Sequence, residues 1–455
     1  MLRSVDPATG ECFATYDAHD DAAVAAAVDQ ADAAFHRWRR TGFTARAEVL
    51  EAVAVQLELR RDELADLMAR EMGKPLADGR AELAKCATAC RFYAGAAADQ
   101  LADRPVATEH PDSFVHCEPL GVVLAIMPWN FPFWQVFRFA APTLMAGNVG
   151  LLKHASNVSG CALAIEQLFA DAGLPDGAWR SLLLASDRIG DLIDHELVRA
   201  VTLTGSGPAG RAVAARAGRA LKKSVLELGG SDAYLVLDDA DLDLAAEVCA
   251  RSRLLNSGQS CISAKRFIVD ASVHDEFVDR FAAELGRAVP GDPRAPDTTM
   301  GPLARIDLRD EVHDQVRRSV DKGARLVLGG SVPEGPGAFY PPTLLVEVQP
   351  GMAAADEEVF GPVAAVLRAD DEDHAVRLAN DTPFGLGAAV FTRDLARGRR
   401  LAAVELEAGS CFVNALVASD PRLPFGGIKA SGYGRELAEL GIRSFVNEKT
   451  VVVAG

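Results

Sequence analysis

The stretch AVTLTGSGPAGRAVAARAGRALKKSVLEL, residues 200–228, shows the architecture of this chain most clearly. Two short apolar runs, 200–204 and 224–228, flank a helical segment at 209–219. A strand, a helix and a second strand in this order predict a βαβ unit in a parallel sheet. The glycines of TGSGPAG allow close backbone approach, and a helix N-terminus attracts phosphate. Their spacing is not GxGxxG, so this loop alone is a weak dinucleotide signature.

The same alternation continues on both sides of this unit. Upstream, apolar runs at 122–127, 150–153 and 181–185 surround a helical segment at 158–172. Downstream, a second series of strands is expected near 233–237, 266–269, 325–328 and 389–391. Two α/β domains are therefore predicted, in agreement with a length of 455 residues.

The two ends of the chain differ from this middle part. The first hundred residues predict helices at 20–40 and 44–72, the second starting at a Thr44 N-cap and stopping at Gly73. The tail at 444–453 ends in a β-rich run, which is a candidate pairing edge for oligomerisation.

Composition excludes several classes of function. A net charge of −17 argues against a general nucleic-acid or anionic-membrane binder. The most apolar stretch, 120–134, contains two prolines and an asparagine, so no membrane span is predicted. The eight cysteines form no CxxC pair and the N-terminus lacks a signal-peptide core, which together predict reduced thiols in a cytoplasmic protein without a metal site.

Three residues are candidates for catalysis, and each has an ordinary alternative. Cys261 lies in the polar loop NSGQSC, where a thiol can be presented, although most lone cysteines are small core residues. Glu227 ends an apolar strand, where desolvation raises a carboxyl pKa towards the range of a general base; alternatively it caps a helix or forms an ion pair. Asn130 is fixed between the prolines of PWNFP as a candidate oxyanion donor, or else it satisfies its own turn.

The order of these motifs along the chain identifies a family. PWNFP, the strand end at Lys153, TGS, ELGG, GQSC, EEVFGP at 357–362 and PFGGIKASGYGRE at 424–436 together resemble the aldehyde dehydrogenase superfamily over nearly the whole chain. The resemblance implies an α/β fold of three parts. These are a variant Rossmann dinucleotide-binding domain at 1–110 and 124–228, an α/β catalytic domain at 229–431, and a small β oligomerisation arm at 111–123 and 432–455. A homodimer or homotetramer is implied as well.

The resemblance also implies roles for the three candidates. Cys261 would attack an aldehyde to form a thiohemiacetal, whose oxyanion Asn130 and the Cys261 backbone N–H would stabilise. A thioester would follow after hydride transfer, and Glu227 would activate the water that hydrolyses it.

Further positions match cofactor contacts of the family. Glu358 and Phe360 match the family positions that contact the nicotinamide ribose and ring. Lys153 and Ser156 match the positions at the adenosine ribose, and Trp129 matches a position that lines the cofactor site. The turn that would face the pyrophosphate contains Gly205, Ser206 and Gly210. NAD-specific members commonly have a glutamate where this chain has Ser156. A carboxylate there would repel a 2′-phosphate, so NADP is the predicted cofactor, with NAD as the alternative.

For the substrate, PFWQVFRFAAPTLMAGNVGLLKHASN and LTGSGPAG look like the shorter bacterial succinate-semialdehyde dehydrogenases. Arg138 would pair with a distal carboxylate, helped by Ser419, unless it is a surface or interface arginine. Many such enzymes have a second arginine where this chain has Leu255, and the sequence assigns no role to His154. Glutarate semialdehyde and uncharged short aldehydes stay open as substrates. A CoA-acylating enzyme, a thioesterase and a catalytically silent relative are the competing interpretations; the retained Glu227, the phosphate turn and Cys261 argue against them in turn.

Overall fold

The first of two large sheets is built from the apolar runs in the first half of the chain. The computed structural model describes residues 1–454, and it orders this six-stranded sheet β17-β9-β8-β5-β6-β7. All neighbours are parallel except the pair formed by β17 and β9. Its strands are β5 (Val122–Met127), β6 (Val149–His154), β7 (Trp179–Ser181), β8 (Val198–Thr204), β9 (Lys223–Glu227) and β17 (Gly432–Tyr433). Every residue of β5 and β6 is buried, as expected for strands covered on both faces.

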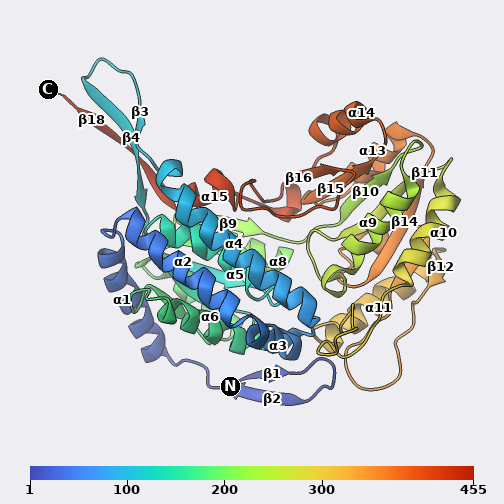
Figure 1. Cartoon of the computed structure of the whole chain (residues 1–455), viewed down its shortest axis with the longest axis horizontal. Helices are drawn as coiled ribbons and strands as arrows, with labels where there is room; N and C mark the ends of the chain where they lie inside the picture. Colours follow the sequence, from blue (N-terminus) through green and yellow to red (C-terminus); the bar gives the residue numbers. More distant parts are fainter. Residues whose placement is uncertain (455) are drawn as a thin grey trace.

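Helices from the first 220 residues cover this sheet (Figure 1). They are α1 (Asp21–Trp38), α2 (Phe43–Leu59), α3 (Arg61–Met72), α4 (Leu76–Gln100), α5 (Trp134–Met145), α6 (Ser159–Asp171), α7 (Ile189–Asp194) and α8 (Gly207–Arg219). The single helix predicted at 44–72 is wrong, because the chain breaks at Arg60 into α2 and α3. Gly42 rather than Thr44 is the N-cap of α2. The break lets both helices pack against α4 and α6. Gly73, at a left-handed φ of 80°, ends α3 as predicted.

The second sheet has seven strands in the order β12-β13-β14-β11-β10-β15-β16. All neighbours are parallel except β12 and β13. Its strands are β10 (Asp232–Val236), β11 (Ala264–Asp270), β12 (Arg325–Leu328), β13 (Thr343–Val346), β14 (Val363–Ala369), β15 (Gly387–Phe391) and β16 (Ser410–Val413). The helices of this part are α9 (Leu242–Leu254), α10 (His274–Leu285), α11 (Ile306–Asp321), α12 (Ala353–Asp356), α13 (Glu372–Asn380) and α14 (Leu395–Arg400). None of the helices within residues 1–454 combines the length and apolar character that crossing a bilayer requires.

A small three-stranded sheet projects from the body beside the C-terminus (Figure 1). It consists of β3 (Arg104–Pro105), β4 (Asp112–Pro119) and β18 (Val446–Val453), and β18 pairs antiparallel along the whole of β4. An N-terminal hairpin, β1 (Leu2–Val5) with β2 (Cys12–Tyr16), contacts α3 and α6.

The expected limits of the arm differ from these strands. Val122 and Val123 begin β5 of the six-stranded sheet, because their side chains are fully buried there. Residues 432–445 also belong to the body, since β17 pairs with β9 and α15 (Ala438–Arg443) packs against α4 and α5. The strand expected at 181–185 is shifted as well: β7 ends at Ser181.

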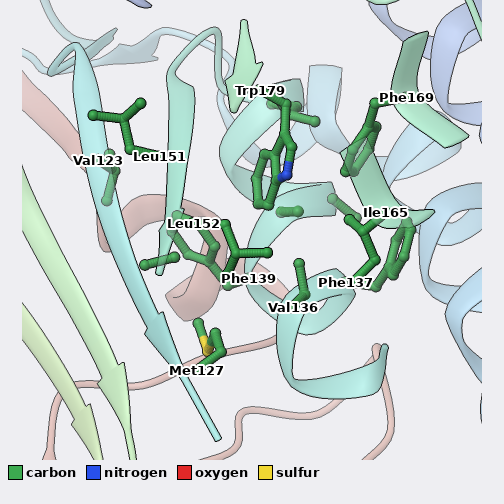
Figure 2. Close-up of a cluster of buried hydrophobic side chains, with 14 of the residues drawn as sticks. Val123, Met127, Val136, Phe137, Phe139, Leu151, Leu152, Ile165, Phe169 and Trp179 are labelled. Carbon is green, nitrogen blue, oxygen red and sulfur yellow. The ribbon is translucent and has the colours of Figure 1, made fainter. Parts of the chain in front are cut away.

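Aromatic side chains fill the space between the first sheet and its helices. Figure 2 shows Phe137 of α5, Phe169 of α6 and Trp179 of β7 in one cluster with Phe139 and Leu152. The Phe137 and Phe169 rings stack with centroids 5.3 Å apart, and Phe169 lies 4.9 Å from Trp179. Such pairs add to the free energy gained by burial.

We expect Phe137→Ala to lower the free energy of unfolding by about 3–5 kcal/mol, because it removes a fully buried ring and leaves a cavity. Urea denaturation followed by tryptophan fluorescence measures this. Leu59→Ala, at a helix end where the side chain is 74% exposed, is the control and should cost less than about 1 kcal/mol. Equal effects of the two substitutions would contradict the assignment of this core.

Candidate active site

The loop that carries Cys261 has an unusual backbone. After α9 ends, Asn256, Ser257 and Gly258 all adopt left-handed φ angles of 55°, 56° and 76°. Two consecutive non-glycine residues in this region are strained, and surrounding contacts must hold them there. The Asn256 Nδ2 donates to the carbonyls of Asn130 (2.7 Å) and Gln259 (3.1 Å). A Cβ on Gly258 would lie 2.3 Å from the Gly361 backbone, so only glycine fits. The loop is thus fixed against both halves of the molecule.

Cys261 forms part of the wall of two separate cavities. One, of about 260 Å³, lies beside the first sheet and is lined by Trp129, Thr204, Gly205, Ser206, Glu358 and Phe360, among others. The other, of about 190 Å³, is lined by α4, α5 and the loop after β16. Cys261 and Gln135 line both. A nucleophile in this position can meet a group entering from either side.

Burial raises the pKa of the Cys261 thiol to about 12, and the charges of Arg138 and Lys265 oppose the rise. The Lys265 ammonium donates to the backbone carbonyls of Ser260 (3.0 Å) and Cys261 (2.7 Å). The thiol is therefore neutral near pH 7 in this conformation. Its use as a nucleophile requires a proton acceptor.

Asn130 lies beside Cys261 in the wall of the larger cavity. Its Nδ2 donates to the Gln259 carbonyl at 3.0 Å, which fixes the side chain on the nucleophile loop. A primary amide has two N–H groups, so the second is available to an oxyanion. The sequence prediction that Asn130 and Cys261 lie together agrees with this geometry.

His154, which had no assigned role, holds the turn that contains Asn130. Its Nε2 lies 2.9 Å from the Pro132 carbonyl and its Nδ1 accepts from the Ala155 N–H at 3.0 Å. Burial lowers the pKa of His154 to about 4, so the ring is neutral near pH 7. A neutral imidazole with Nε2–H satisfies both contacts.

Glu227 does not line either cavity. Glu227 ends β9, and its carboxylate is buried against Gly426. A Cβ added to Gly426 would lie 2.7 Å from the Glu227 Oε1. Burial raises the pKa of Glu227 well above its usual range, and the neighbouring Glu436 raises it further. The raised pKa agrees with the sequence prediction. The carboxylate itself faces a buried charged cluster in this conformation, rather than the thiol.

Arg138 belongs to the same buried cluster. Its guanidinium forms an ion pair with Glu436, donates to Thr204 Oγ1 at 3.1 Å and stacks over the Phe425 ring at 4.7 Å. It lines the smaller cavity, but its charge is already compensated. The expected contact of Arg138 with a substrate carboxylate stays a prediction, and in this structure Glu436 occupies the guanidinium. A buried guanidinium without a partner would be too costly, and Glu436 supplies that partner.

The predicted cofactor residues separate into two groups. Trp129, Gly205, Ser206, Glu358 and Phe360 all line the larger cavity. The Trp129 and Phe360 rings meet edge to face, with centroids 5.8 Å apart. The Glu358 Oε1 accepts from the Gly230 N–H at 3.0 Å. Helix α8 begins after Ser206 without a side-chain cap, so its first N–H groups remain available to a phosphate. The site fits a dinucleotide.

The remaining cofactor residues lie outside this cavity. Lys153 lies near the end of β6, which pairs with β5, and Ser156 follows the strand and is exposed. Gly210 instead packs against Leu228, whose side chain leaves no room for a Cβ. It lets α8 pack closely against the chain after β9, and the contact of Gly210 with a pyrophosphate stays a prediction.

Several residues that no sequence motif predicted reach the cavities from distant elements. Helix α11 contributes Leu308, Glu311, Val312 and Gln315 to the larger cavity. Helix α4 contributes Lys85 to the smaller one, where its ammonium donates to Ser419 Oγ at 2.8 Å. Ser419 itself was expected at the substrate. Neither helix carries a motif, and only the fold brings them to the site.

Comparisons with known proteins agree with this geometry. The model of the aldehyde dehydrogenase family matches residues 1–451. The probable succinate-semialdehyde dehydrogenase [NADP(+)] of Synechocystis is 49% identical, with the whole of both chains covered. The succinate semialdehyde dehydrogenase [NAD(P)+] of Escherichia coli is 47% identical over 98% of this chain and 97% of its own.

A solved structure agrees as closely. The succinic semialdehyde dehydrogenase of Streptococcus pyogenes, in complex with NADP+, superposes with a TM-score of 0.97 at 37% identity, with both chains fully covered. The site has a cysteine on a strained loop between two cavities and an uncapped helix at one of them. The family model matches nearly every residue, and the chain therefore belongs to the aldehyde dehydrogenase family.

Proposed function

We propose that this enzyme oxidises succinate semialdehyde to succinate with NADP. The position of Cys261 in the shared wall of two cavities is the observation that carries this proposal. One cavity has the donors and aromatic walls that suit a dinucleotide. The other, of about 190 Å³, has room for a short substrate whose carbonyl carbon reaches Cys261. The names of the relatives support the same substrate and cofactor.

The chemistry begins at the thiol. Cys261, which is partly exposed, gives its proton to solvent water, and its sulfur attacks the aldehyde carbon. A C–S bond forms as the C=O double bond opens, which places negative charge on the former carbonyl oxygen. The free N–H of Asn130 and the Cys261 backbone N–H donate to that oxygen. One such donor is worth roughly 3–4 kcal/mol of transition-state stabilisation.

The oxidised nicotinamide, when bound, supplies the acceptor for the hydride that leaves this carbon. Trp129, Glu358 and Phe360 are the residues that would hold it. The carbon then remains on Cys261 as a thioester. Glu227 accepts a proton from water, and the water oxygen bonds to the thioester carbon. The C–S bond then breaks, the proton held by Glu227 returns to the sulfur, and the acid leaves with the thiol restored. For this step the Glu227 side chain turns from the buried cluster towards Cys261, and a raised pKa suits it to the task.

We expect Glu227→Gln to separate the two halves of the reaction. The thioester still forms, so a rapid-mixing experiment shows a burst of about one NADPH per active site. The steady rate then falls by about 10²–10⁴-fold, because no base activates water. Cys261→Ala removes the burst itself, and Glu439→Gln, an exposed residue on α15, serves as the control. Loss of the burst in Glu227→Gln, or an unchanged steady rate in this variant, would contradict this role.

The same carboxyl predicts how the rate depends on pH. Glu227 accepts a proton only when ionised, and its pKa is raised. The steady rate should therefore rise as pH increases through that raised pKa, above the usual titration range of glutamate near 4.3. The amplitude of the burst is the control, because the amount of thioester formed per active site does not depend on this base. A steady rate already at its plateau at pH 5 would contradict the assignment.

The preference for NADP rests on the end of β6. Ser156 is exposed and neutral. Lys153 is the residue before the last in β6, and it forms no ion pair within residues 1–454. A lysine beside a neutral side chain suits a 2′-phosphate. NAD, whose ribose hydroxyls also fit this position, is the alternative.

We expect Ser156→Glu to lower kcat/KM for NADP by about 100-fold or more while changing that for NAD by less than about tenfold. Two like charges about 4 Å apart near a protein surface repel by about 4 kcal/mol, and 1.4 kcal/mol corresponds to tenfold. Absorbance at 340 nm with each cofactor measures the ratio. Ser156→Ala is the matched control and should keep NADP preference; an unchanged ratio in Ser156→Glu would place the 2′-phosphate elsewhere.

The projecting sheet supports a proposal on assembly. One edge of β18 pairs with β4, and no strand within residues 1–454 pairs with the other. A long unpaired edge is a template for another strand, so we infer that it joins copies of this chain into a homodimer or homotetramer. Analytical ultracentrifugation should find a mass above that of one chain. A chain ending at Phe445 should form a smaller species, and a wild-type monomer would contradict the inference.

A further inference from the structure

The smaller cavity has a polar corner where three elements meet. Lys85 comes from α4, Trp134 begins α5 and Ser419 lies in the loop after β16. Cys261 and Ile262 line the same cavity. An aldehyde with its carbonyl at Cys261 would therefore extend along this cavity, and whatever group it carries at its far end meets these walls.

Lys85 is the side chain in this corner that has free hydrogen-bond donors and an unpaired charge. Its ammonium donates to Ser419 Oγ at 2.8 Å and lies 4.3 Å from the centroid of the Trp134 ring. Within residues 1–454 no carboxylate comes within ion-pair distance of it. An ammonium has three N–H groups, and Ser419 takes one. The aromatic face and the hydroxyl hold the charge in place without neutralising it.

The other charged groups around the cavity already have partners. Glu82 pairs with Lys74 and accepts from the Phe133 and Trp134 N–H groups, both at 2.8 Å. Asp420 is paired with Arg422, which donates at 2.6 and 2.9 Å. The last acid in the wall, Asp78, lies near Lys74, and burial raises its pKa towards the neutral form.

Arg138, the remaining cation in this wall, is paired with Glu436. That pair is almost entirely buried. Removing one member of a buried pair is costly, so a substrate gains little by competing for Arg138. The uncompensated positive charge of the cavity is therefore at Lys85.

We propose that Lys85, held by Ser419 and Trp134, binds the distal carboxylate of the substrate, and that Arg138 acts through Glu436 as a positioning residue. This inference rests on the proposed function and refines it, since it names the residue that distinguishes a carboxylated aldehyde from an uncharged one. Lys85 is then a specificity-determining residue, and the reaction at Cys261 does not require it.

The test compares two aldehydes of equal length, succinate semialdehyde and butanal, in the wild type, Lys85→Met and Lys85→Arg. Steps common to both substrates cancel in the ratio of their kcat/KM values. Lys85→Met should lower this ratio by about 30-fold or more, through KM for the acid, because a desolvated charge pair is lost. Lys85→Arg should keep much of it. Lys322→Met, which removes an exposed lysine at the end of α11, is the matched control and should not change it.

A ratio unchanged in Lys85→Met would overturn the proposal and return carboxylate binding to Arg138. The substrate assignment itself fails in a different way, namely if the wild type does not prefer succinate semialdehyde to butanal. A second measurement does not depend on turnover: succinate should slow the alkylation of Cys261 by iodoacetamide in the wild type. It should do so much less in Lys85→Met, and equal protection of the two proteins would also overturn the proposal.

The pH dependence of the ratio gives an independent signature. Burial and the nearby Arg138 charge lower the pKa of Lys85 to about 8, against the opposing charges of Glu82 and Asp420. Lys85 is charged below this pH and neutral above it. The preference for the acid should therefore be full below pH 8 and decline above it. In Lys85→Arg the decline should disappear, since guanidinium stays protonated. A preference that persists to pH 10 in the wild type would contradict the proposal.

Discussion

The contact between the Asn256 side chain and the Asn130 carbonyl is the constraint on which the site depends. Asn256 precedes the nucleophile in the half of the chain that forms the seven-stranded sheet, whereas Asn130 follows β5 of the six-stranded sheet. One amide thus fixes the thiol loop to the oxyanion turn across the two halves of the molecule. The left-handed residues at 256–258 persist because this hydrogen bond and the close approach of Gly361 hold them. The strained backbone at 256–258 thus lies shortly before Cys261, where the position of the sulfur must be precise.

Burial then determines how the charged groups behave. The site buries Glu227 and Glu436 fully and Cys261 partly, and desolvation raises the pKa values of all three. A neutral thiol and a buried carboxyl that faces away from it do not react until a substrate binds and the Glu227 side chain changes position. Such a resting state protects a reactive cysteine, at the cost of a proton transfer before each turnover.

Arg138 and Lys85, the two basic residues at the smaller cavity, differ in their partners and therefore in their roles. Arg138 has a buried carboxylate partner, and its planar guanidinium also stacks on Phe425. Lys85 has only a hydroxyl and an aromatic face. The first arrangement builds the wall, and the second leaves a charge for a ligand. A positive residue near a site is thus informative about substrates only when its partners are known.

The sequence by itself determined the strand and helix order, the two parallel sheets and the motifs around Cys261, Asn130 and Glu227. These follow from local periodicity and from short motifs, whose residues are neighbours along the chain. Tertiary structure decided the rest. It split the helix at Arg60, placed Gly210 in packing, paired Arg138 with Glu436 and brought α11 over the larger cavity. The contact between Lys85 and Ser419 joins residues 334 positions apart. No local pattern encodes such a contact, because it arises only when separate elements pack and each buried charge finds its partner.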